Sequence, residues 1–115
     1  HAPLLVVGPT DRASRRRKTS RLLSATEPLV VSALREAAAI TGQAFWDTRA
    51  AMGGNGAITR WRRQRLAQRD LVHLTGLGYE RLGDLLSDAL LAAFEDYRSA
   101  RAANGAQQAA APPQP

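Results

Sequence analysis

The sequence contains no cysteine, so it can form neither a disulfide bond nor a zinc site with thiolate ligands. It has only two histidines, and one of them is the terminal His1, so no histidine metal site is expected. No apolar run approaches the roughly 20 residues that span a bilayer, and no basic, then apolar start resembles a signal peptide. What remains is ordinary globular usage, with 44% hydrophobic and 23% charged residues.

Acidic charge is also scarce, and the 115 residues carry a net charge of +6. The basic residues gather in two clusters, one at Arg12 and residues 15–18, the other at residues 60–65 around Trp61. Such clusters form either a solvated surface or a site for nucleic acid or another anionic polymer. Single-strand binders interleave aromatic residues with the charges, and only Trp61 does so here. We therefore expect no nucleic-acid partner and keep a basic binding module as the alternative function.

The start of the chain predicts a piece of a longer protein. The first residue is His1 in place of Met, and the apolar run at residues 3–8 follows almost at once. That run is typical of a buried strand in a parallel sheet, which needs neighbouring strands on both sides. The oligomeric state cannot be predicted from these features.

Strand and helix patterns alternate along the chain. Thr26 and Gly42 are the expected caps of the first helix, and Thr75 is the expected N-cap of the last one. The predicted elements are a strand at 3–8, a loop at 9–25, a helix at 27–41, a strand from 43, a glycine turn at 53–56, a short helix at 57–66, a loop at 67–74 and a long helix from 75.

This order predicts the α/β fold class, with two parallel strands and three helices. Two strands are too few for a stable sheet, so the chain is expected to be the edge of a larger domain. Residues 1–101 belong to that domain. Residues 102–115 are rich in Ala, Gln and Pro and are expected to form a disordered tail.

The loop at 67–74 contains the residues most suited to chemistry, Asp70 and His73. In α/β sheets, reactive groups gather in loops beyond the carboxyl ends of strands. Three residues of separation across a turn allow the carboxylate to reach Nδ1 of the imidazole, which leaves Nε2 available to accept a proton. The spacing alone is also compatible with an ordinary polar turn.

The longer string "RDLVHLTGLGYERLGDLLSDALL" resembles the final block of the SGNH hydrolases, also called the GDSL esterase/lipase family. The family pattern is Asp-x-x-His, then Thr, a glycine–tyrosine pair and an amphipathic helix. The segments "AFWDTRAAMGGNGAITRW" and "PLLVVGPTDRA" are similar to earlier parts of bacterial members, so the resemblance covers roughly residues 3–98. The matching positions of the final block are Asp70, His73, Thr75, Gly78, Tyr79 and Gly83.

The resemblance implies a three-layer α/β/α domain with a five-stranded parallel sheet, of which this chain supplies the C-terminal part. It implies a serine esterase without a cofactor, in which His73 is the base and Asp70 orients it. The family nucleophile lies in a Gly-Asp-Ser stretch that this chain lacks, so neither a nucleophile nor an oxyanion-hole residue is assigned. The isolated chain is therefore expected to be inactive.

Substrate and location follow only from the resemblance. Bacterial members with similar segments act on acetylated saccharides or cell-wall glycans, which implies a small-molecule or glycan ester, including peptidoglycan O-acetyl groups, and a periplasmic or secreted protein. The segment Met52, Gly53, Gly54 and Asn55 follows a strand and either lines the substrate pocket or forms an ordinary turn.

Overall fold

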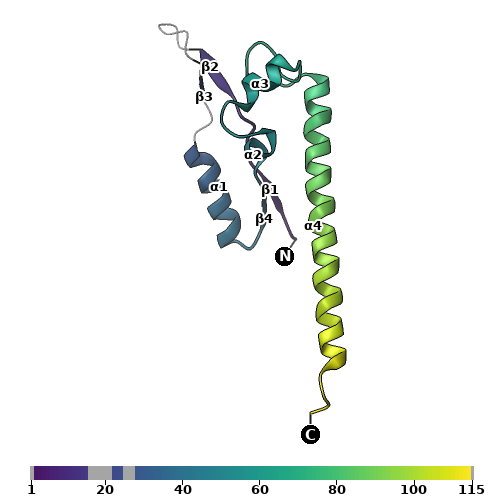
Figure 1. The fold of residues 1–115 in the computed structure, drawn as a ribbon. Helices are drawn as coiled ribbons and strands as arrows, with labels where there is room; N and C mark the ends of the chain where they lie inside the picture. The colour runs from purple at the N-terminus through teal and green to yellow at the C-terminus, as the bar shows by residue number, and fades with distance from the viewer. Residues whose placement is uncertain (1, 16–21, 25–27, 115) are drawn as a thin grey trace. The chain divides into compact units, whose positions relative to one another are not determined.

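The structure is a computed structural model, and it describes residues 2–15, 22–24 and 28–114. It divides into two compact units, His1–Gly83 and Asp84–Pro115. The first unit contains all the strands and the start of the last helix (Figure 1). The elements in chain order are β1 Leu5–Val7, β2 Ala13–Arg15, β3 Leu22–Ser24, α1 Pro28–Ile40, β4 Ala44–Trp46, α2 Thr48–Met52, α3 Ala57–Arg63 and α4 Gly76–Ala110.

The predicted α/β fold class and the pairing of the two predicted strands are confirmed. Strands β1 and β4 are parallel, with Leu5 opposite Ala44 and Val7 opposite Trp46. The main-chain N–H of Gly8 extends this pairing by donating to the carbonyl of Trp46 at 2.8 Å. Helix α1 connects the two strands, as a parallel crossover requires.

Helix α1 ends where the sequence predicts. Gly42 adopts a left-handed φ of 68°. The N–H groups of Gly42 and Gln43 donate to the carbonyls of Ala39 and Ala38 at 3.2 and 2.8 Å. These two bonds form a Schellman cap, which satisfies carbonyls that the helix leaves unpaired. The predicted N-cap, Thr26, lies outside the described residues.

The loop predicted at 9–25 contains two short strands instead. Strands β2 and β3 pair in antiparallel fashion, with Ala13 opposite Ser24. A second addition is helix α2, which Asp47 caps through Oδ1, since this atom accepts a hydrogen bond from the N–H of Ala50 at 2.9 Å. These three elements are short. Each strand has three residues and the helix has five, so none of them gives a periodic sequence signal.

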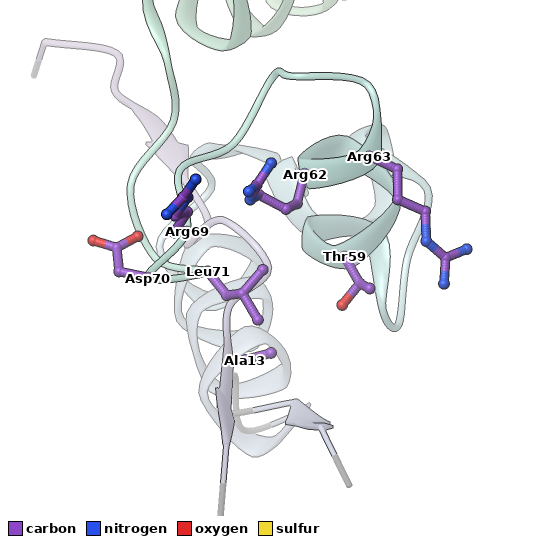
Figure 2. A pocket seen from close by; sticks show the side chains of 7 residues that line it. All are labelled: Ala13, Thr59, Arg62, Arg63, Arg69, Asp70 and Leu71. Atoms are coloured by element: carbon purple, nitrogen blue, oxygen red, sulfur yellow. The ribbon is translucent and has the colours of Figure 1, made fainter. Parts of the chain in front are cut away.

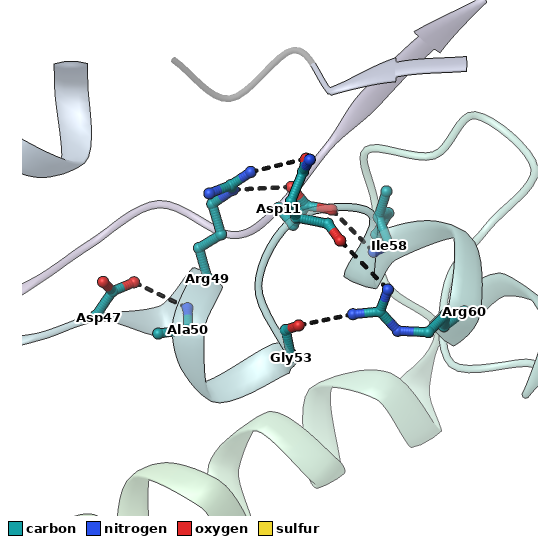
Figure 3. A network of polar contacts seen from close by, with 8 residues as sticks. Asp11, Asp47, Arg49, Ala50, Gly53, Ile58 and Arg60 are labelled. Carbon is teal, nitrogen blue, oxygen red and sulfur yellow. Dashed lines mark hydrogen bonds and ion pairs between the residues drawn. The ribbon is translucent and has the colours of Figure 1, made fainter. Parts of the chain in front are cut away.

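A buried carboxylate, Asp11, joins the loop after β1 to helices α2 and α3 (Figure 3). Its side chain is fully buried. Oδ1 accepts from Nε of Arg49 at 3.0 Å, and Oδ2 accepts from the N–H of Ile58 at 3.0 Å. Because a buried charge is costly unless it is paired and hydrogen-bonded, these contacts fix the relative positions of the three segments.

Helix α4 begins at the predicted N-cap and ends later than the sequence indicates. The Oγ1 of Thr75 accepts from the N–H of Gly78 at 3.1 Å, a side-chain cap of the kind predicted. The helix continues through Ala110, so residues 102–110 are helical in place of the expected disordered tail. Alanine has the highest helix propensity and glutamine a favourable one, and these residues make up most of that segment.

Several large apolar side chains of the first unit stay exposed. Leu4 and Val7, in and beside β1, are 61% and 50% exposed, and Leu29 and Ile40 at the ends of α1 are each 77% exposed. A two-stranded sheet covers little apolar surface.

Candidate functional site

The loop between α3 and α4 brings the predicted pair together. Oδ2 of Asp70 lies 2.6 Å from Nδ1 of His73. Oδ1 of Asp70 accepts hydrogen bonds from the N–H groups of Val72 and His73, both at 3.0 Å. The carboxylate therefore holds both the ring and the backbone of the loop. No hydrogen bond from another described residue reaches Nε2 of His73, and the side chain is 64% exposed.

Backbone contacts of the loop fix where the pair lies. Gln68 donates its N–H to the carbonyl of His73 at 2.8 Å and its side-chain amide to the carbonyl of Leu74 at 3.0 Å. Leu71 adopts a left-handed φ of 58°, which is uncommon for a branched residue and turns the chain between Asp70 and His73. Its carbonyl accepts from the N–H of Ala13 at 3.0 Å, which ties the loop to β2.

Hydrogen bonding lowers the pKa of Asp70 from 3.8 to about 2, first through the His73 side chain and then through the N–H groups of Val72 and His73. The pKa of Asp70 is lower in the folded chain than in the unfolded chain, where it is about 4. The ionised side chain therefore stabilises the fold at pH values above about 4. That contribution is lost as the pH falls through about 2.

Replacing His73 with alanine is therefore expected to raise the pKa of Asp70, which remains below 3.8 because the backbone donors stay in place. The measurement is an NMR titration of the Asp70 carboxyl carbon. A Val72→Ala variant is the control, because it preserves the backbone N–H and is expected to leave the midpoint unchanged. An identical midpoint in His73→Ala would show that the ring does not bind the carboxylate.

A pocket of about 640 Å³ opens beside this pair, between α3 and the loop (Figure 2). Asp70 belongs both to the pocket wall and to the contact with His73. The sequence assigns the arginines of 60–65 to a cluster but gives no sign that some of them face a pocket. Its lining residues are Ala13, Thr59, Arg62, Arg63, Arg69, Asp70 and Leu71.

The segment predicted to line a substrate pocket makes internal contacts. Met52 is buried and accepts from Nε1 of Trp61 through its carbonyl at 3.0 Å. The carbonyl of Gly53 accepts from Arg60 at 2.7 Å, and the side-chain oxygen of Asn55 accepts from Arg49 at 3.0 Å. Gly54 adopts a left-handed φ of 80° in the same turn. None of these residues lines the pocket beside Asp70, and their role toward a substrate stays a prediction.

Neither a metal-binding cluster nor a membrane-spanning helix occurs among the described residues. Among the described residues, no three His, Asp or Glu side chains gather closely enough to hold a metal ion. In the same part of the chain, no helix is both long and apolar enough to cross a membrane.

The chain is similar to a solved structure described as a peptidoglycan O-acetylesterase. The match has a TM-score of 0.69 and 27% sequence identity, and it covers 83% of this chain and 27% of that one. The chain thus spans about a quarter of the length of the esterase it matches. No model of a known protein family matches the chain, and no curated protein does either. The likeness shows that this α/β fold corresponds to part of an esterase fold, and it supports a relationship with hydrolases.

Proposed function

We propose that the chain is the part of an SGNH-type serine ester hydrolase that carries the histidine base and its aspartate. The complete protein hydrolyses carbohydrate esters, with O-acetyl groups of peptidoglycan as the leading candidate substrate. The observation that carries the proposal is the 2.6 Å contact between Asp70 and His73, within a fold that matches part of a peptidoglycan O-acetylesterase.

The geometry suits His73 to proton transfer. Because Oδ2 of Asp70 accepts from Nδ1, the neutral ring presents the lone pair of Nε2 outward. In the proposed reaction, Nε2 takes the proton of a serine hydroxyl as its oxygen attacks the acyl carbon. The protonated ring then gives that proton to the departing alkoxide, and an acyl-serine remains. Water releases the acyl group in a second round of the same transfers.

Asp70 has two roles in this proposal. It fixes the tautomer and orientation of the ring, and its negative charge stabilises the imidazolium that forms in each step. The low pKa of Asp70, about 2, keeps the carboxylate ionised at neutral pH. The serine and the oxyanion-hole donors are assigned to residues outside this sequence, since no serine here follows Gly-Asp.

The test is covalent labelling with a fluorophosphonate, which reacts with the activated serine of serine hydrolases and releases fluoride. The protein encoded by the complete reading frame is expected to be labelled on a single serine, and His73→Ala is expected to suppress that labelling. Residues 1–115 alone are expected to remain unlabelled. Absence of labelling in the folded complete protein, or equal labelling in His73→Ala, would contradict the proposal and favour the basic binding module.

A further inference from the structure

The pocket beside Asp70 presents positive charge from two facing segments. Arg62 lies in the last turn of α3 and Arg69 in the following loop, and their guanidinium groups are directed toward the space between them (Figure 2). Among the residues that the structure describes, neither guanidinium has an ion-pair or hydrogen-bond partner. By contrast, Arg60 in the same helix is bound by the carbonyls of Gly53 and Asn55.

The nearby carboxylate offsets only one of these two charges. Asp70 lines the pocket, but its two oxygens are bound to His73 and to the backbone of the loop. Two guanidinium groups on one pocket repel each other, and a bound anion would relieve that repulsion. A guanidinium binds a carboxylate or phosphate through paired N–H donors, with a geometry that a lysine does not offer.

We propose that this pocket binds a carboxylate of the substrate, on the alcohol side of the ester that the proposed hydrolase cleaves. The inference rests on the proposed function and names its substrate class: an anionic ester. Because Asp70 both lines the pocket and holds Nδ1 of His73, a substrate group bound by Arg62 and Arg69 lies on the Asp70 side of the ring, within reach of an ester held at Nε2. Two arginines and one aspartate leave this part of the pocket with a net charge of about +1, which a singly charged carboxylate balances.

The experiment compares aryl acetates whose leaving groups differ in charge, hydrolysed by the complete protein, and follows how the preference among them changes from variant to variant. The substrates are 4-acetoxybenzoate, its neutral methyl ester, and 4-acetoxyphenyl phosphate. The measured quantity is the ratio of kcat/KM for 4-acetoxybenzoate to kcat/KM for the methyl ester. Each of Arg62→Gln and Arg69→Gln is expected to lower this ratio by about threefold, and the double variant by about tenfold.

Two controls separate a pocket from general surface charge. Arg81→Gln removes the same charge from an exposed position outside the pocket and is expected to leave the ratio unchanged. Arg62→Lys keeps the positive charge but not the paired N–H donors of the guanidinium. It is expected to lower the ratio less than Arg62→Gln does. For the unaltered protein, the ratio is expected to fall as sodium chloride is raised from 0.05 to 0.5 M, on the order of severalfold, because salt screens exposed charges.

The outcomes distinguish this inference from the function on which it rests. If the neutral ester is not hydrolysed at all, the proposed function fails and the inference fails with it. If it is hydrolysed but the two arginine variants keep the original ratio, or Arg81→Gln lowers it equally, the hydrolase stands and the pocket assignment is overturned. If the acetyl group of 4-acetoxyphenyl phosphate is hydrolysed with a higher kcat/KM than that of 4-acetoxybenzoate, the choice of a carboxylate as the bound anion is overturned.

Discussion

Replacing His73 with alanine is expected to lower kcat for ester hydrolysis by the complete protein by about 10⁴-fold or more. In the proposed mechanism the variant loses the ring that accepts the serine proton, and the described residues contain no other histidine. Most of the loss should appear in kcat, because a proton-transfer group contributes to the transition state more than to substrate binding. The measurement is p-nitrophenyl acetate hydrolysis across pH 5 to 9.

Two further variants define what this loss means. Asp70→Asn preserves the size of the side chain and removes its charge, so a loss on the order of 10³-fold is expected from the disturbed tautomer and the missing stabilisation of the imidazolium. Val72→Ala changes an exposed residue that lies between Asp70 and His73 in the sequence, and this variant is expected to retain nearly full activity.

Equal rates of hydrolysis for His73→Ala and the unaltered protein would show that the imidazole ring takes no part in the reaction. That result would leave the contact of Asp70 with His73 as a feature that only stabilises the loop.

The fold was predictable where the sequence has strong local signals. Gly42 terminates α1 because glycine adopts the left-handed backbone of the cap without a steric cost, and Thr75 caps α4 with its hydroxyl. Apolar runs bounded by turn residues located β1 and β4. Signals of this kind depend on only a few neighbouring residues, so they can be recognised in a single sequence.

The features that the sequence did not reveal depend on distant contacts. Asp11 is polar and lies in a predicted loop, yet it is fully buried because Arg49 and the N–H of Ile58 meet it from segments about 40 residues away. The pocket also depends on residues that are far apart in the sequence, since Ala13 and Arg62 both line it. The Asp70–His73 contact was predictable because both groups lie in one turn, whereas the pocket beside them was not.

The largest expected effect on stability comes from Gly78, in the first turn of α4. A Cβ atom added there would clash with the carbonyl oxygen of Leu66 and would lie 3.0 Å from the Cβ of Leu74. The first neighbour is backbone, which cannot rotate away as a side chain could. The same carbonyl accepts the N–H of Thr75 at 3.0 Å, so moving it would also break the hydrogen bond that holds the N-cap in place.

Gly78→Ala is therefore expected to lower the free energy of unfolding by about 3 to 4 kcal/mol, from overpacking and the lost hydrogen bond. Gly83→Ala is the matched control, because its Cβ would meet nothing within 4 Å. There, alanine should stabilise the helix by about 0.5 to 1 kcal/mol through its higher helix propensity. Chemical denaturation of both variants measures the difference. Similar stability in the two would mean that α4 does not approach Leu66 this closely, and that the glycine of the Gly78–Tyr79 pair is not required for packing.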